Sequence, residues 1–207
     1  MNREVSLDMM IHHAKCVVEK TRNAFIVVDM PFGTYEQSKE QALKNAKKII
    51  AITGASAIKL EGGETLFNTI KYLTKNKIKV MGHLGMLPQS LKGKPKVYGK
   101  NKKEKAQLIK DVNLLEKAGV FSIVLECVYK NLVDELIHLT KMPLIGIGAS
   151  PKCKGQIIVT EDILGMTEFS SKFSKKYFQF SKNCKKAIKK FAYEVKKKKY
   201  PNKKQCY

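Results

Sequence analysis

Ionisable residues stand at the ends of four short apolar runs, and this repeated ending is the feature of the sequence that most suggests chemistry. Residues 24–28 lead into Asp29, residues 57–58 into Lys59 with Glu61 two positions on, residues 80–82 into His83, and residues 123–125 into Glu126. Short runs rich in Val and Ile, separated by helical stretches, are typical of parallel strands buried on both faces. A barrel of alternating strands and helices gathers its strand ends around one mouth, so we expect these five residues to form a site.

Two carboxylates on neighbouring strands, Asp29 and Glu61, suit Mg²⁺, a hard cation that takes few protein oxygens and keeps positions for water and substrate. Alternation along the strand places Lys59 on the same side as Glu61, where an ammonium group can hold an anionic substrate. Plainer interpretations stay open at this point. Asp29 alone is also typical of a turn cap, and Lys59 with Glu61 is typical of a structural ion pair.

Glu126 lies in so apolar a run that it loses hydration, which makes a carboxylate a stronger base and a candidate general base. A buried partner elsewhere is the alternative explanation. His83 lies between two glycines, and a lone histidine is more often structural than catalytic. Cys127 is expected to be an inert thiol in its apolar surroundings. Together, metal-binding carboxylates, a cation and a buried base indicate metal-assisted proton abstraction next to a carbonyl group.

The elements that position these residues alternate along the chain. Strand patterns occur at 24–29, 56–60, 78–83, 121–127 and 143–147, and helical stripes at 6–20, 36–52, 66–73, 102–118, 132–137 and about 182–199. Residues 155–166 are ambiguous between strand and helix. Short connections without hairpin dipeptides favour parallel βα units, five or six in number. A full eight-unit barrel takes about 250 residues, so we predict an incomplete α/β barrel. It forms one domain over residues 1–207, opens on a helix and carries a basic amphipathic helix near its end.

The formal net charge of +22 raises the question of nucleic-acid binding. Arginine, the residue suited to bidentate phosphate contacts, occurs only at Arg3 and Arg22, and the lysines are spread along the chain. We therefore expect no specific nucleic-acid partner, and at most weak polyanion binding at 92–105 and 182–204. No run of about 18 apolar residues predicts a membrane span, and no secretory pattern opens the chain. Five scattered cysteines without paired spacing favour the cytoplasm.

Six segments stand out by their residue sequences and by their order along the chain. They are Val-Asp-Met-Pro-Phe at 28–32, Ile-Lys-Leu-Glu-Gly-Gly-Glu at 58–64, Gly-His-Leu-Gly-Met-Leu-Pro-Gln-Ser at 82–90, Leu-Glu-Cys-Val at 125–128, Ile-Gly-Ile-Gly-Ala-Ser at 145–150 and Gly-Gln-Ile-Ile-Val at 155–159. In order and spacing, over roughly residues 5–201, the chain resembles the 3-methyl-2-oxobutanoate (ketopantoate) hydroxymethyltransferase family.

The resemblance implies a (βα)8 TIM-type barrel of the phosphoenolpyruvate mutase/isocitrate lyase kind. It also implies transfer of a hydroxymethyl group from 5,10-methylenetetrahydrofolate to 3-methyl-2-oxobutanoate, which gives 2-dehydropantoate for pantothenate biosynthesis. By the same resemblance, Asp29 binds Mg²⁺ and the keto acid, Lys59 binds the substrate and Glu61 belongs to the metal site. Glu126 is then the proton acceptor, and His83 lines the pocket. The family also forms homo-oligomers, decamers among them.

The chain departs from the family pattern in three places. The family has two further βα strands before the region that this chain covers, and the second carries an Asp-Ser pair that binds metal and substrate. Lys154 stands where the family usually has an aspartate, and the loop at 91–99 is shorter than usual. Two other functions therefore stay open: a related Mg²⁺-dependent 2-oxo acid lyase or aldolase, and a catalytically dead remnant with weak polyanion binding.

Overall fold

The structure of the protein is a computed structural model, which describes residues 4–91, 93–168 and 171–207. The chain divides into two compact units, one that extends to Ile157 and one that comprises Ile158–Tyr207. Each unit is described by itself. The single domain over residues 1–207 stays a prediction.

The first unit is built around a parallel sheet whose six strands follow one another in chain order. The strands are β1 (Val27–Asp29), β2 (Ala57–Glu61), β3 (Val80–Gly85), β4 (Ser122–Glu126), β5 (Leu144–Ile147) and β6 (Gly155–Gln156). Within the described residues, β1 and β6 each pair on one side only. The predicted parallel α/β architecture is therefore confirmed, and the ambiguous segment at 155–166 contributes the short strand β6 and a short helix after it.

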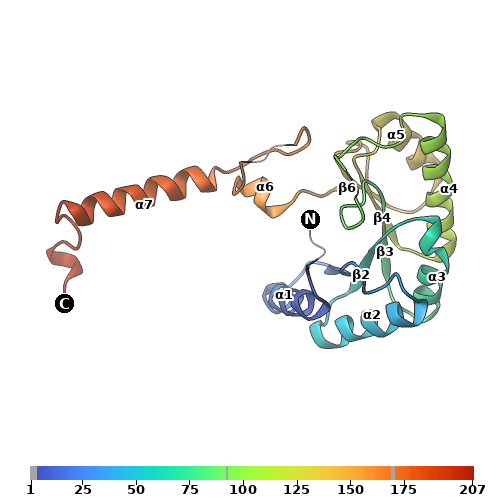
Figure 1. Cartoon of the computed structure of the whole chain (residues 1–207), viewed down its shortest axis with the longest axis horizontal. Coiled ribbons are helices and arrows are strands. Elements are labelled where there is room, and N and C mark those ends of the chain that lie inside the picture. The colour runs from blue at the N-terminus through green and yellow to red at the C-terminus, as the bar shows by residue number, and fades with distance from the viewer. Residues whose placement is uncertain (1–3, 92, 169–170) are drawn as a thin grey trace. The chain divides into compact units, whose positions relative to one another are not determined.

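Five helices of the first unit follow one another along one side of the sheet, and all but the first connect successive strands (Figure 1). They are α1 (Leu7–Lys20), α2 (Lys39–Thr53), α3 (Phe67–Lys75), α4 (Lys102–Ala118) and α5 (Lys130–Leu139), with a 3₁₀ turn η1 (Glu64–Leu66) before α3. The unit opens on a helix, as the sequence predicts, and Ser6 caps that helix by accepting a 3.2 Å hydrogen bond from the Met9 N–H.

The core fills the space between the helices and the sheet. Ile49 of α2, Ile70 of α3 and Leu115 of α4 are fully buried, and they belong to the same cluster as Ile58 of β2 and Ile123 of β4. Burial of one such side chain contributes about 1.5–3 kcal/mol. This apolar packing fixes the strands, and therefore the side chains that stand at their ends.

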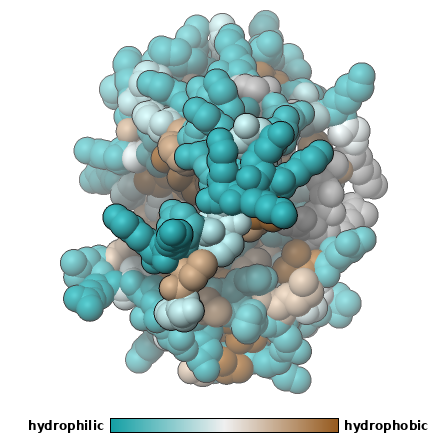
Figure 2. Space-filling model, turned by 90° about the vertical axis from the view of Figure 1, so that its left-hand side faces the viewer, coloured by the Kyte–Doolittle hydropathy of each residue, from teal (hydrophilic) through white to brown (hydrophobic). Residues whose placement is uncertain are grey.

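The second unit contains α6 (Thr160–Leu164), α7 (Phe180–Lys196) and the 3₁₀ turn η2 (Lys203–Gln205). Helix α7 is the basic helix predicted at about 182–199; it ends three residues early, just before Lys198 takes a positive φ of 54°. It contains no buried residue. Hydrophilic side chains cover most of the face drawn in Figure 2, in keeping with the 40 lysines and arginines. Among the described residues, every helix is too short or too polar to cross a membrane.

Two glycines with positive φ allow a direct test of how β3 is fixed against β4. A Cβ atom on Gly85 (φ +92°), the last residue of β3, would lie 2.2 Å from the backbone oxygen of Glu126, whereas a Cβ on Gly33 (φ +84°) would meet nothing within 4 Å. We expect Gly33→Ala to lower the free energy of unfolding by about 1–2 kcal/mol, the cost of the left-handed conformation. Gly85→Ala should lose a further ~1–3 kcal/mol by overpacking. Urea unfolding measures both, and equal losses would contradict the close approach.

Candidate active site

The structure brings all five predicted site residues together at the carboxyl ends of the first four strands. Asp29, Glu61 and Glu126 are the last residues of β1, β2 and β4, and His83 lies in the second half of β3. The strand register places Asp29 beside Lys59, and Glu61 beside His83. Parallel pairing of adjacent strands therefore gathers these side chains at one edge of the sheet.

Lys59 is at the centre of this group. Its ammonium nitrogen Nζ lies 2.8 Å from Asp29 Oδ1 and 3.9 Å from Glu61 Oε1, and it contacts His83 Nδ1 at 3.2 Å. The contact with Glu61 confirms that Lys59 and Glu61 face the same side of β2. Because one cation contacts both carboxylates, it offsets the repulsion between two like charges that the fold brings close together.

His83 connects the two halves of the site. An ammonium group only donates hydrogen bonds, so the contact with Lys59 assigns Nδ1 as the acceptor and places the ring proton on Nε2. Nε2 lies 3.2 Å from Glu126 Oε2, while Nδ1 is 3.6 Å from Glu61 Oε1. The imidazole ring therefore lies between Glu61 on β2 and Glu126 on β4, with its N–H on the side of Glu126.

Two buried polar atoms of the site lack a hydrogen bond among the described residues, namely Asp29 Oδ1 and His83 Nε2. Both have a charged neighbour at close distance, but neither contact has hydrogen-bonding geometry. Unsatisfied buried polar atoms are costly, and native structures keep few of them. Their presence at the strand ends is the property expected of a site that receives a polar ligand.

The residues fit a hard divalent cation of the Mg²⁺ type. Asp29 Oδ1 is buried and accepts no hydrogen bond, and Glu61 Oε1 faces the same ammonium group. Mg²⁺ is commonly bound through one or two carboxylates while it keeps several waters. Within the described part of the chain, no group of three or more His, Cys, Asp or Glu side chains is arranged to hold a metal ion. A site built on two carboxylates is compatible with that finding.

Glu61 is the most enclosed carboxylate of the site. Its side chain is 4% exposed, and its Oε2 accepts a 2.9 Å hydrogen bond from the backbone N–H of Gln89. Burial raises the pKa of Glu61, and the nearby Lys59 and His83 counteract that rise. The cost of burying the ionised carboxylate is thus larger than its stabilisation by Lys59 and His83. A further positive charge beside Glu61 would therefore stabilise the ionised form.

Sequence reasoning missed three residues that support the end of β2: Tyr35 and Gln89, which contact Glu61, and Asp111, which contacts the segment after it. Tyr35 and Gln89 follow β1 and β3 in the loops at the carboxyl edge, and both contact Glu61. Gln89 lies within the distinctive segment 82–90, so its position after a strand end was a usable signal. Asp111 lies inside helix α4, where nothing in the sequence distinguishes it from a surface carboxylate.

Asp111 fixes the segment that follows Glu61. Its Oδ1 accepts hydrogen bonds from the Glu64 N–H at 2.8 Å and from Gln107 Nε2 at 3.1 Å. A Cβ atom on Gly63 would lie 2.3 Å from the Asp111 carboxyl carbon, so a glycine at 63 permits this approach. Helix α4 therefore caps η1 with a buried carboxyl and holds the loop between β2 and α3 in place.

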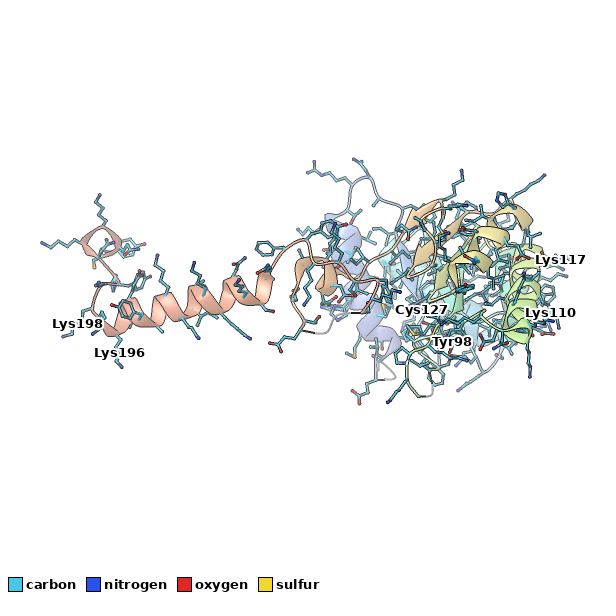
Figure 3. The ribbon with its side chains drawn as sticks, turned by 90° about the horizontal axis from the view of Figure 1, so that it is seen from above. Tyr98, Lys110, Lys117, Cys127, Lys196 and Lys198 are labelled. Atoms are coloured by element: carbon cyan, nitrogen blue, oxygen red, sulfur yellow. The ribbon has the colours of Figure 1, made fainter. Side chains whose placement is uncertain are left out.

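The loop after β3 is attached to the end of β4. The Tyr98 N–H donates to the Cys127 carbonyl at 2.8 Å, and the Tyr129 N–H donates to the Tyr98 carbonyl at 2.8 Å. Tyr98 and Cys127 are labelled in Figure 3. Cys127 is buried, and burial raises the pKa of its thiol, with a smaller contribution from Glu126. This agrees with the expectation that Cys127 is unreactive. The backbone of the loop is thus anchored one residue away from Glu126.

Solved structures of similar fold define the class of this protein. A 2,3-dimethylmalate lyase of the PEP mutase/isocitrate lyase superfamily aligns with a TM-score of 0.56 over 99% of this chain and 72% of its own, at 12% identity. A phosphonopyruvate hydrolase, solved with oxalate and Mg²⁺, aligns with a TM-score of 0.51 over 98% of this chain and 74% of its own, at 13% identity. The protein therefore shares the α/β fold of these structures, as a parallel six-stranded partial barrel.

Sequence comparison gives the family. The family model for ketopantoate hydroxymethyltransferase matches residues 2–203. A 3-methyl-2-oxobutanoate hydroxymethyltransferase of Pelagibacter ubique (strain HTCC1062) is 49% identical over 99% of this chain and 79% of its own length. One of Bartonella henselae (strain ATCC 49882 / DSM 28221 / CCUG 30454 / Houston 1) is 44% identical over 98% and 74%. The chain belongs to the ketopantoate hydroxymethyltransferase family, which places it among the transferases.

The buried carboxyl of Asp111 gives a pH-dependent prediction. Burial raises its pKa in the folded protein, more than its hydrogen bonds lower it, so the folded state binds this proton more tightly than the unfolded chain does. The stability that Asp111 contributes relative to asparagine is then fully present below about pH 4. It is lost as the pH rises through the folded-state pKa. The free energy of unfolding of the wild type minus that of Asp111→Asn should therefore fall as the pH rises above about 4.

Urea unfolding of the two proteins at several pH values measures this difference. The neighbouring Glu64, whose pKa is lowered by Lys110 and Gln107, is present in both proteins, so its titration largely cancels. A difference that grows with pH would show that Asp111 is stabilised as a carboxylate, contrary to its burial.

Proposed function

We propose that this chain transfers a hydroxymethyl group from 5,10-methylenetetrahydrofolate to 3-methyl-2-oxobutanoate, with the strand-end residues as its active site. The observation that carries this proposal is the arrangement of two carboxylates, an ammonium group and a histidine–glutamate pair in one continuous set of contacts. A 2-oxo acid with a C–H bond next to its keto group needs these parts: a cation for its carboxylate, an electrophile for its keto oxygen and a base for its proton.

Asp29 and Glu61 would hold Mg²⁺, whose chemistry when bound is to polarise the keto group and so acidify the neighbouring C–H bond. The unsatisfied Asp29 Oδ1 and the cost of burying Glu61 support this assignment. The phosphonopyruvate hydrolase of similar fold was solved with Mg²⁺ and oxalate, a small dicarboxylate.

Copies of the chain would assemble as a homo-oligomer.

Lys59 would bind the carboxylate of the keto acid. Lys59 lies within β2, two residues before the strand ends, and its side chain is 17% exposed. The ammonium group can therefore reach a ligand at the strand ends while it stays partly shielded from water. An ammonium group in such a position attracts a carboxylate more strongly than a surface lysine does. By its contacts with Asp29 and Glu61, it would also orient the acid beside the metal-binding oxygens.

Glu126 would take the proton from C3 of the keto acid. The C–H electrons become the second bond of the enolate as the keto π electrons move to oxygen. Water releases the one-carbon unit of the folate as formaldehyde: its two C–N bonds break, the nitrogens take the two protons of the water, and tetrahydrofolate leaves. C3 of the enolate then bonds to the formaldehyde carbon, the keto group re-forms, and the new alkoxide takes the proton held by Glu126. His83 Nε2 lies 3.2 Å from Glu126 Oε2, so that a small rotation of the carboxylate would let the Nε2–H donate to it and hold it at the strand ends. The second oxygen of Glu126 is then free to receive the proton.

Proton exchange tests this assignment without the folate. Incubation of 3-methyl-2-oxobutanoate in D₂O with the protein and Mg²⁺ should replace the C3 proton, seen as loss of its NMR signal, and chelation of the metal should stop the exchange. Glu126→Gln should slow the exchange at least about 100-fold, because general bases contribute about 10²–10⁴-fold.

Glu116→Gln is the matched control, since Glu116 is an exposed carboxylate on α4, away from the strand ends. It should exchange at the wild-type rate. Circular dichroism and urea unfolding check that both variants fold. Undiminished exchange in Glu126→Gln would remove Glu126 as the base, and a wild type that exchanges no proton with Mg²⁺ present would contradict the proposed function.

A further inference from the structure

Tyr35 and Gln89 form a closed ring of hydrogen bonds around Glu61. The Tyr35 hydroxyl accepts from the Glu61 backbone N–H at 3.4 Å and donates to Gln89 Oε1 at 3.1 Å. The backbone N–H of Gln89 in turn donates to Glu61 Oε2 at 2.9 Å. Glu61 is therefore held at its backbone and at its carboxylate by two residues that are bonded to each other.

The ring joins the loops that follow three different strands. Gln89 Nε2 also donates to the Met30 carbonyl at 3.0 Å, and the Met30 N–H donates to the Lys59 carbonyl at 3.0 Å. Met30 is fully buried and follows Asp29 directly. Gln89 thus connects the end of β1, which carries Asp29, through its side chain, with the Glu61 carboxylate at the end of β2, through its backbone N–H.

The two oxygens of the Glu61 carboxylate have different surroundings as a result. Oε2 accepts the hydrogen bond from Gln89, while Oε1 faces Lys59 Nζ at 3.9 Å and His83 Nδ1 at 3.6 Å. A carboxylate free to rotate would exchange these positions. Because Gln89 fixes one oxygen, the other stays on the side of Lys59 and His83.

Tyr35 suits this role because it is rigid and buried. The residue is 2% exposed, so little water reaches its hydroxyl to compete for the hydrogen bonds with Glu61 and Gln89. A pocket of about 290 Å³ lies beside this ring of hydrogen bonds. Its lining includes Phe32, Tyr35, Glu61, Leu66, Leu87 and Gln89. If the hydroxyl were lost, water from this pocket could replace it and leave Gln89 less constrained.

We propose that Tyr35 and Gln89 are positioning residues, which orient the Glu61 carboxylate and thereby set the affinity of the strand-end site for a divalent cation. The part of this inference that concerns the cation rests on the proposed function. The part that concerns Glu61 does not, because it follows from the hydrogen bonds alone. Outer hydrogen-bonding partners of metal ligands typically change metal affinity by about 10–100-fold.

The test compares Tyr35→Phe with the wild type and with Tyr72→Phe, a matched loss of a hydroxyl on helix α3. In the metal-free proteins, hydrogen exchange at the Gln89 amide should become about tenfold faster in Tyr35→Phe, the loss of about one hydrogen bond. Exchange at core amides such as Leu115 should not change. Calorimetric titration with Mg²⁺ should give a dissociation constant at least about tenfold higher. Tyr72→Phe should match the wild type in both measurements.

A second variant, Gln89→Ala, keeps the backbone N–H but removes the side chain that Tyr35 contacts. If the two residues act as one unit, Tyr35→Phe combined with Gln89→Ala should lose no more Mg²⁺ affinity than the weaker-binding single variant. Fully additive losses would contradict the pair. Gln89→Ala alone should also raise the Mg²⁺ dissociation constant by at least about tenfold, and an unchanged constant in that variant would contradict the proposal without use of Tyr35→Phe.

The remaining outcomes are distinct. Unchanged exchange at Gln89, or acceleration equal to that at Leu115, overturns the positioning role whatever the metal does. Faster exchange with unchanged Mg²⁺ affinity overturns the link between orientation and affinity. A third outcome is that the wild type binds no Mg²⁺, while exchange at the Gln89 amide is still faster in Tyr35→Phe. This result supports the positioning of Glu61. It overturns the inferred control of cation affinity and contradicts the metal in the proposed function.

Discussion

The parallel register of the first four strands is the constraint on which the rest of the site depends. It places Asp29 beside Lys59 and Glu61 beside His83, so that charged groups from different strands meet at one edge of the sheet. Burial of like charges is unfavourable unless they are paired. Lys59 contacts Asp29 and Glu61, and His83 contacts Glu61 and Glu126. Because Glu61 belongs to both pairs, these contacts meet that requirement and give one connected set of polar side chains. The apolar core behind the sheet keeps this set in register.

Around this set, the loops act as supports. Asp111 from α4 fixes the segment after Glu61, and the backbone of Tyr98 ties the loop after β3 to Cys127 at the end of β4. Gln89 joins the ends of β1 and β2. Each of these contacts is a hydrogen bond between a buried or partly buried polar group and a backbone group. The loops at the carboxyl edge of the sheet are therefore held by neighbouring helices, strands and loops as well as by hydrogen bonds within their own turns. Such preorganisation is what a site needs to align a small substrate.

Much of this arrangement could be predicted from the sequence. The apolar runs located β1 to β5 within a few residues, and the same-side placement of Lys59 and Glu61 followed from strand alternation. The sequence did not reveal the supports, because Tyr35, Gln89 and Asp111 act through contacts 26, 28 and 47 residues away along the chain. Nor did it settle residues 155–166, where a two-residue strand precedes a five-residue helix and neither is long enough to give a clear period.

The account rests on the claim that the strand-end cluster is where a divalent cation and a keto acid bind. The most direct measurement is a crystal structure of the protein with 3-methyl-2-oxobutanoate and Mn²⁺ in place of Mg²⁺, in which anomalous scattering locates the metal. The account predicts a metal peak within coordination distance of Asp29 and Glu61, with the acid beside Lys59 and its C3 facing Glu126. A fully occupied metal elsewhere in the chain, with these carboxylates still paired to Lys59, would contradict it.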